Sequence, residues 1–334
     1  MKKLLASALS IIMSASLITG CGTAEKIAVS PENNDKNDKL KVVTTIFPEY
    51  DWVSRIAGDN ADVTMLLDKG VDLHSYQPTA DDIIKISNCD MFIYVGGESD
   101  EWVENALKEA VNENMVVINL LDTLGDSAKE EELAEGMEHE HDEEDEYNDE
   151  HGEEEIEYDE HVWLSLKNAI FFCGHISDKL CEMDPENREF YTSNSESYTE
   201  KLRELDKQYE DAVNSSENKT LLFGDRFPFR YLVDDYGLSY FAAFAGCSAE
   251  TEASFETIVF LAEKTDELGL NSILHIESSD GSIAETIKKN TKSKNQKILT
   301  INSMQSVTSK DVETGLTYLS IMENNLDILK EALR

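Results

Sequence analysis

Four of the seven histidines in this chain lie in one strongly acidic stretch, which runs from Glu138 to Trp163 and reads EHEHDEEDEYNDEHGEEEIEYDEHVW. They are His139, His141, His151 and His161. Imidazole binds zinc and the other late divalent transition metals, whereas carboxylates alone suit calcium or magnesium. A purely acidic run is typically a solvated, disordered segment. The concentration of histidine in this one favours metal capture.

Another histidine, His74, lies in the segment VDLHSYQPTADD, in a loop expected to follow a strand. Ligands bind outside the carboxyl ends of strands in open α/β sheets, and Thr79 is placed to cap the next helix and so to fix the loop. At the end of the acidic stretch, Trp163 and Leu164 follow His161. A buried anchor of this kind would hold His161 in one place. His74 and His161 are therefore the candidate ligands of a fixed metal site.

The charge and the motifs of the chain exclude several classes of function. A formal net charge of −40 argues against nucleic acid and anionic lipid as partners, because phosphate binding needs basic patches. The chain has no HExxH, GxSxG or P-loop motif. The segment DEEDEYNDEHGE lacks the glycine at the sixth position of an EF-hand loop. We therefore expect a binding protein and not an enzyme, with a metal-dependent extracellular hydrolase or an adhesin as the alternatives from other classes.

The N-terminus predicts secretion and lipid attachment. Lys2 and Lys3 precede an apolar stretch over residues 4–18, and the segment then ends in LITGC at Cys21, which resembles a bacterial lipobox. We expect residues 1–20 to be a signal peptide that is cleaved before Cys21, and residues 21–39 to be a lipidated, flexible tether. The predicted location is the outer face of the bacterial cell membrane, with the lipid on Cys21 as the membrane contact.

The remaining chain predicts two lobes joined by a long helix. Short β-branched or aromatic runs alternate with helical patterns, which indicates parallel sheets flanked by helices and thus an α/β fold. The N-terminal lobe is expected over 40–184, with the acidic, histidine-rich loop at about 126–160, and the C-terminal lobe over 214–334. Between them, 185–213 carries one apolar stripe on a helix that would span roughly 43 Å. A helix of this length could brace both lobes.

The cysteines other than Cys21 lack the close CxxC spacing of a zinc ribbon. Cys89 and Cys173 lie in apolar runs, so we expect them to be small core residues instead of ligands. The sequence leaves open whether any pair among Cys89, Cys173, Cys181 and Cys247 forms a disulfide.

Two motifs carry a resemblance to a known family. LHSYQPTADD around His74 and DEHVWLSLKNA around His161 resemble the signatures PHxYxPT and DPHxWLSP of the ZnuA/AdcA-type zinc and manganese solute-binding lipoproteins of bacterial ABC importers. The lipobox, the opening VVTTIFPEYDWV, the acidic insertion and the long helix extend the likeness over almost the whole chain. The resemblance implies two α/β lobes joined by a rigid helix, with the metal held between them.

The resemblance also implies a function. The chain would be a monomeric binding protein that captures zinc and delivers it to an ABC permease and its ATPase. We expect zinc and not manganese because manganese favours oxygen-rich ligation, although a manganese-specific member of the family is the alternative. His139, His141 and His151 are candidate accessory ligands, in a flexible loop that would collect zinc near the site.

The ligands in the C-terminal lobe depart from the family pattern. The resemblance implies that His74 and His161 are the N-lobe ligands. The family then has a histidine, or a glutamate in manganese binders, shortly before an aromatic helix that ends in Tyr-Gly-Leu. An ungapped match places Arg226 there, and arginine has no lone pair to donate. Asp225 is the candidate that takes over, and the alternative is that Asp225 and Arg226 form a structural ion pair.

The last family ligand is an acidic residue of the C-terminal lobe. Glu277 matches it at the end of an expected strand, while a later aspartate that some members use corresponds to the region of Asn302, a poorer ligand. His275 alternates with Glu277 on one strand face and is a candidate accessory ligand, or else a core residue. Glu250 and Glu252 form an acidic loop pair that could face the cleft or cap the next helix.

Overall fold

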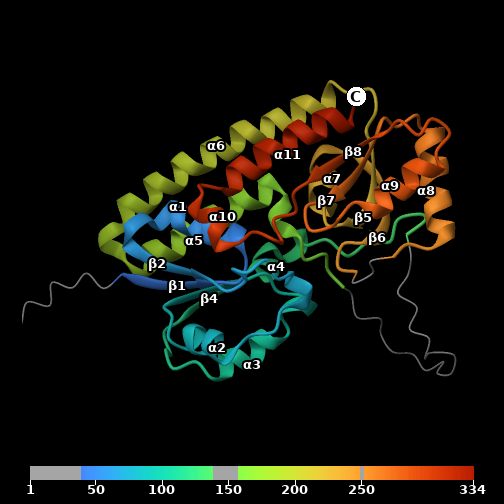
Figure 1. Ribbon diagram of the computed structural model, residues 1–334. Coiled ribbons are helices and arrows are strands. Elements are labelled where there is room, and N and C mark those ends of the chain that lie inside the picture. Colours follow the sequence, from blue (N-terminus) through green and yellow to red (C-terminus); the bar gives the residue numbers. More distant parts are fainter. Residues whose placement is uncertain (1–38, 138–156, 249–251) are drawn as a thin grey trace, which may run out of the picture. The chain divides into compact units, whose positions relative to one another are not determined.

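The computed structural model describes residues 39–137, 157–248 and 252–334, and within these ranges the strands form two four-stranded parallel sheets (Figure 1). Their strand orders are β2-β1-β3-β4 in the N-terminal lobe and β6-β5-β7-β8 in the C-terminal lobe. Residues 39–334 belong to one structural unit. The predicted α/β class is therefore confirmed. In the described ranges, no helix is both long enough and apolar enough to cross a membrane.

Several predicted residues lie outside the described ranges, and the structure says nothing about them. They are the predicted signal peptide, Cys21 and nearly all of the tether, most of the acidic loop with His139, His141 and His151, and Glu250.

The N-terminal sheet has its most buried strands, β1 and β3, at its centre, as expected of a parallel sheet covered by helices. Strand β3 lies between β1 and β4, and its first three residues are fully buried. The strands of this lobe are β1 Leu40–Thr44, β2 Ala61–Met65, β3 Met91–Tyr94 and β4 Val116–Asn119, and its first helices are α1 Phe47–Ala57, α2 Ala80–Ser87, α3 Trp102–Lys108 and α4 Leu120–Leu124.

The C-terminal sheet is built in the same way but contains one irregularity that matters for the site. The register between β5 and β6 shifts between Phe223 and Arg226. Gly224 lies within this shift, and a Cβ there would meet the backbone of Ala284 in α9 at 2.5 Å. The elements are β5 Thr220–Phe227, α7 Arg230–Tyr236, β6 Ser239–Ala245, α8 Phe255–Glu267, β7 Ser272–Ile276, α9 Ser282–Asn290, β8 Lys297–Ile301, α10 Ser309–Glu313 and α11 Tyr318–Ala332.

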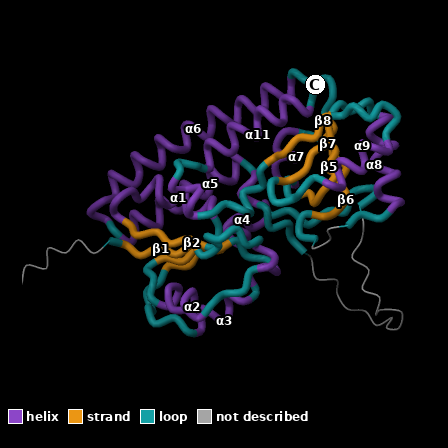
Figure 2. Tube along the Cα trace, in the orientation of Figure 1, coloured by secondary structure: helices purple, strands orange, loops and turns teal. Residues whose placement is uncertain are grey.

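The long helix α6 and the C-terminal helix α11 connect the two lobes along their length. Helix α6, Arg188–Asn214, follows α5, Leu166–Met183, and runs beside α11 (Figures 1 and 2). Near its start, the hydroxyl of Tyr198 donates to Asp51 in α1 at 3.1 Å. Further along, the hydroxyl of Tyr209 donates to the carbonyl of Met322 in α11 at 2.6 Å. The helix expected over 185–213 is thus present and holds both lobes.

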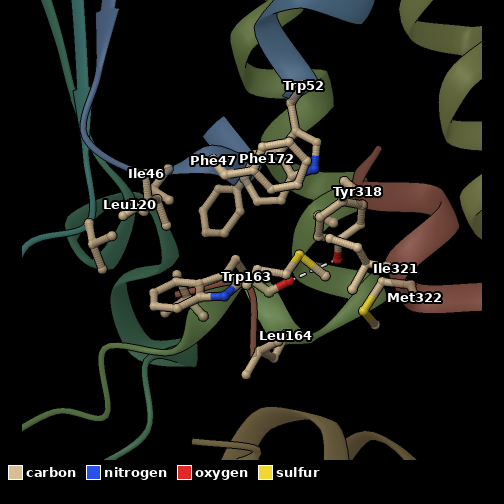
Figure 3. Packing of buried hydrophobic residues seen from close by; sticks show 14 of the residues in the cluster. Ile46, Phe47, Trp52, Leu120, Trp163, Leu164, Phe172, Tyr318, Ile321 and Met322 are labelled. Carbon is tan, nitrogen blue, oxygen red and sulfur yellow. Dashed lines mark hydrogen bonds between the residues drawn. The ribbon is translucent and has the colours of Figure 1, made fainter. Parts of the chain in front are cut away.

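An aromatic cluster fills the space where α1, α5 and α11 meet (Figure 3). Trp52 stacks on Phe172 with ring centroids 5.8 Å apart, and it meets the edge of Tyr318 at 5.3 Å. The hydroxyl of Tyr318 donates to the carbonyl of Trp163 at 2.8 Å. The indole Nε1 of Trp163 donates to the carbonyl of Ser303, in the loop after β8, at 2.9 Å. One core therefore continues from lobe to lobe, which limits how far they can separate.

Candidate metal centre

The loop that carries His74 is fixed by its own side chains. His74 lies in the short 3₁₀ helix η2, Leu73–Ser75, after strand β2. Asp72 caps this helix, because its carboxylate accepts the backbone N–H of His74 at 3.1 Å. Thr79 caps α2, and Asp82 bonds back to both the backbone and the side chain of Thr79. The cap that the sequence predicts at Thr79 is confirmed.

His161 is held still more tightly. It precedes the 3₁₀ helix η5, Val162–Leu164, and its side chain is fully buried. One oxygen of Asp159 accepts both the backbone N–H of His161 at 2.8 Å and the ring Nδ1 at 3.0 Å. A carboxylate at Nδ1 selects the tautomer that carries its hydrogen there, which leaves the Nε2 lone pair directed outward.

The ring of His74 is oriented in a similar way. Its Nδ1 lies 2.7 Å from the hydroxyl of Ser99 and 3.5 Å from the carboxylate of Glu160. The pKa of His74 is lowered to about 3, first by burial and then by the neighbouring His161 and Arg226, while Asp72 opposes the shift. His74 is therefore neutral near pH 7, and the carboxylate beside Nδ1 favours a lone pair on Nε2.

Gly97 permits the contact between Glu160 and the loop that carries Ser99. Glu160 accepts the backbone N–H of Ser99 at 2.9 Å. A Cβ on residue 97 would lie 2.4 Å from the same carboxylate, and the φ of Gly97 is +81°. Only glycine combines this backbone conformation with so close an approach.

The two histidines meet with the spacing of a metal site. Their Nε2 atoms are 3.3 Å apart. Zinc binds imidazole nitrogen at about 2.0–2.1 Å, and the edge of a tetrahedron is about 1.6 times the bond length, so two nitrogens on one zinc lie about 3.3 Å apart. Two facing lone pairs repel each other unless a donor or a cation serves both. The geometry of His74 and His161 therefore fits one tetrahedral divalent metal.

In the structure, an amide donor serves both lone pairs. The side-chain nitrogen of Gln305, in the loop after β8, lies 2.9 Å from Nε2 of His161 and 3.2 Å from Nε2 of His74. The amide oxygen of Gln305 accepts the hydroxyl of Ser303 at 3.2 Å. A metal ion that binds both histidines must displace or rotate this amide.

A third metal-binding side chain belongs to Cys247, which follows strand β6. The sulfur of Cys247 and one ring nitrogen each of His74 and His161 all lie within 4.8 Å of one another. Among the described residues, this is the one group of three or more histidine, cysteine or carboxylate side chains with such spacing. Burial raises the pKa of the Cys247 thiol above its usual range, and nearby Glu131 raises it further.

The structure does not bring the predicted C-lobe ligands to this pair. One oxygen of Asp225 accepts the backbone N–H of Ile276 at 3.0 Å and the hydroxyl of Ser279, and the other accepts the backbone N–H of Arg226 at 2.8 Å. The Arg226 guanidinium pairs with Asp72 at 2.6 Å, so the ion pair links the lobes instead of joining neighbours. This arrangement gives no support to Asp225 as a ligand.

Glu277 also bonds elsewhere. It accepts the backbone N–H of Ser303 at 2.6 Å and the hydroxyls of Ser303 and Ser306 at 3.1 Å each. Glu277 thus organises the loop that carries Gln305. The ring of His275 lies 3.3 Å from the hydroxyl of Ser279 and 2.8 Å from that of Thr300, so both of its nitrogens have partners away from the pair.

An acidic pocket of about 380 Å³ opens onto His74 and Cys247. Five carboxylates line it together with Ser99 and Tyr158, and they are Glu98, Glu101, Glu131, Glu157 and Glu160. The backbone of Glu157 pairs with that of Glu131 at 2.9 Å, where the acidic insertion returns to the fold. Because a cleft lined by one sign of charge concentrates counter-ions, this pocket attracts cations to the side of His74.

Asp100 makes the stability of the neighbouring turn depend on pH. Its buried carboxylate accepts the backbone N–H groups of Val95 and Gly96 at 3.0 Å each. The pKa of Asp100 is raised to about 7, chiefly by burial and also by Glu160, while these hydrogen bonds oppose the shift. In the unfolded chain the pKa is about 3.9, so the folded state binds this proton more tightly. The free energy of unfolding should therefore fall as the pH rises from about 4 to 7.

We expect Asp100→Asn to remove this contribution. Relative to the variant, the wild type should lose up to roughly 1.4 kcal/mol per pH unit across that window. Urea unfolding with a chelator present, at about pH 5 and about pH 8, measures the effect. Asp126→Asn, on an exposed turn, is the control. Equal pH dependence in the wild type and in Asp100→Asn would contradict the prediction.

Comparisons with known proteins find similar sequences over most of the chain. The family model ZnuA, described as zinc-uptake complex component A (periplasmic), matches residues 42–332. The chain is 34% identical over 298 residues to the zinc-binding lipoprotein AdcA of Streptococcus pneumoniae, which covers 88% of this chain and 56% of that protein. It is 32% identical over 317 residues to the high-affinity zinc uptake system protein ZnuA of Bacillus subtilis, covering 95% and 94%. The chain thus spans little more than half the length of its streptococcal relative.

Solved structures show the same fold. The Zn(II)-bound ZnuA-like domain of Streptococcus pneumoniae AdcA superposes with a TM-score of 0.68 at 29% identity, over 88% of this chain and 99% of that one. The metal-dependent lipoprotein YcdH of Bacillus subtilis gives a TM-score of 0.71 at 29% identity, over 88% and 99%.

Proposed function

The chain belongs to the ZnuA family of zinc-uptake complex components, and on this premise we propose that it captures Zn²⁺ outside the cytoplasm and delivers it to an ABC importer. His74 and His161 are the ligands that hold the ion. The observation that carries the proposal is the 3.3 Å separation of their Nε2 atoms, with each ring oriented through its Nδ1. A site formed by protein side chains alone suits capture and release, without a reactive bound water.

The remaining parts of the chain serve this function in the proposal. Cys21 carries the lipid that keeps the protein, as a monomer, at the outer face of the cell membrane. His139, His141 and His151 collect zinc and pass it to the acidic pocket at Glu157. The shared core and α6 hold the lobes at nearly constant distance, so release requires small local movements that the permease and its ATPase would drive.

A titration of the purified full-length chain tests the proposal. After metal removal, zinc is added in competition with a chromophoric chelator, and the same is done with a chain that lacks residues 138–156. We expect one tight zinc site per chain in both proteins, with weaker sites only in the full-length chain. Manganese at equal concentration should leave the tight site filled with zinc. Loss of the tight site on deletion, or its preferential filling with manganese, would overturn the proposal.

A further inference from the structure

We propose that Cys247 supplies a thiolate to the zinc ion from the C-terminal lobe, so that the site selects thiophilic divalent metals against manganese. The inference rests on the proposed function and specifies the donor set of that same site: two imidazole nitrogens and one sulfur. Thiolate is a ligand of zinc and other soft or borderline metals, whereas manganese favours carboxylate, carbonyl and water.

The position of the sulfur supports this role. The Cys247 sulfur lies within 4.8 Å of one ring nitrogen each of His74 and His161. With a Zn–S bond of about 2.3 Å and a Zn–N bond of about 2.0–2.1 Å, sulfur and nitrogen on one tetrahedral zinc lie about 3.6 Å apart. The 4.8 Å limit exceeds this spacing by about 1 Å, so a small side-chain movement brings the sulfur to that distance from a ring nitrogen of each histidine. Binding forms the Zn–S bond and breaks the S–H bond, and the proton passes to solvent through the acidic pocket that Cys247 also lines.

The backbone before Cys247 gives a second and independent line of support. A Cβ on residue 246 would lie 3.0 Å from Cε1 and 3.1 Å from Nδ1 of His161. The end of β6 therefore lies directly against the buried imidazole, at a distance that any side chain on Gly246 would oppose. The backbone N–H of Cys247 donates to Glu131 at 3.3 Å, which holds the turn in place.

The other candidate side chains of the C-terminal lobe bind different partners. An ungapped match with the family expects a metal ligand at the position of Arg226. The guanidinium of Arg226 is a cation, and it forms an ion pair with Asp72 at 2.6 Å. Asp225 and Glu277 accept backbone N–H groups at 3.0 Å and 2.6 Å. Among the residues that the structure describes, no carboxylate joins the group formed by the two histidines and Cys247.

Cobalt provides the direct test, because thiolate bound to Co²⁺ gives an intense near-ultraviolet charge-transfer absorption that imidazole and oxygen ligands lack. We expect this absorption from one Co²⁺ bound to the full-length wild-type chain, and its loss in Cys247→Ser. Cys89→Ser, at a buried cysteine of the N-terminal lobe, is the matched control and should keep it. Zinc affinity should fall roughly 10²-fold or more in Cys247→Ser, with little change for manganese.

A second measurement covers the case in which Cys247→Ser does not fold. Zinc should protect Cys247 of the wild type from alkylation by iodoacetamide, as mapped by peptide mass spectrometry. If Cys247→Ser keeps the cobalt absorption and the zinc affinity, or if zinc gives Cys247 no protection, the inference fails while the proposed function stands. If the wild type binds no zinc at His74 and His161, the proposed function fails first.

Discussion

Alanine at His161 is expected to weaken zinc binding by about 10²–10³-fold, and alanine at both His161 and His74 by roughly 10⁵-fold. Structural zinc sites contribute about 10–16 kcal/mol in total, so one ligand of a four-coordinate site accounts for about 3–4 kcal/mol. That energy corresponds to two to three factors of ten for each ligand, as an order of magnitude. Chelator-competition titrations in a chain that lacks residues 138–156 measure the effect without interference from the other histidines of the insertion.

Two further variants distinguish the loss of a metal ligand from a general loss of folding. Asp159→Asn leaves both ligands present but removes the charge that orients His161 through its Nδ1, so we expect a loss of about 10–100-fold. His275→Ala is the matched histidine control, because both of its ring nitrogens bond to hydroxyls of its own lobe. Unchanged stoichiometry and affinity in the double variant would rule out the assignment of His74 and His161.

The meeting of His74 and His161 in the candidate site could be predicted because each histidine is positioned by its neighbours in sequence. Asp72 and Thr79 fix the loop of His74 through caps only a few residues away. Trp163 anchors His161 two residues further on, and it is almost completely buried. Helix caps and anchors only a few residues away can be recognised in a single sequence. The same is true of the β–α alternation that predicts the two sheets.

The C-lobe half could not be predicted because its residues are brought together by tertiary structure. Cys247 and Gln305 follow β6 and β8, the two edge strands of the sheet, and no spacing or periodicity relates them. Asp225 lies at the expected sequence position, within the register shift of β5. Its carboxylate, however, accepts hydrogen bonds from Ile276 at the end of β7 and from Ser279 in the loop that follows. Cys247 could have been identified from its position just after the end of a strand. The same argument identified His74.

Removing the indole of Trp163 is expected to be the most damaging single change to the fold near the site. A tryptophan or phenylalanine replaced by alanine in a core costs about 3–5 kcal/mol, against a total stability of about 5–15 kcal/mol. Trp163 is 1% exposed and lies at the junction of the two lobes (Figure 3). We expect Trp163→Ala to lower the urea midpoint of the metal-free protein strongly and to weaken zinc binding as well.

The effect on zinc follows from what the indole holds. Its N–H donates to the carbonyl of Ser303, and Ser303 in turn bonds to Gln305 and Glu277. Trp163→Phe keeps most of the buried surface but loses that one hydrogen bond, at a cost of about 1 kcal/mol of stability. If the bridge positions the loop after β8, Trp163→Phe should weaken zinc binding by more than its small loss of stability explains. Zinc affinity equal to that of the wild type would show that Trp163 acts through packing alone, and that the loop finds its place through Glu277.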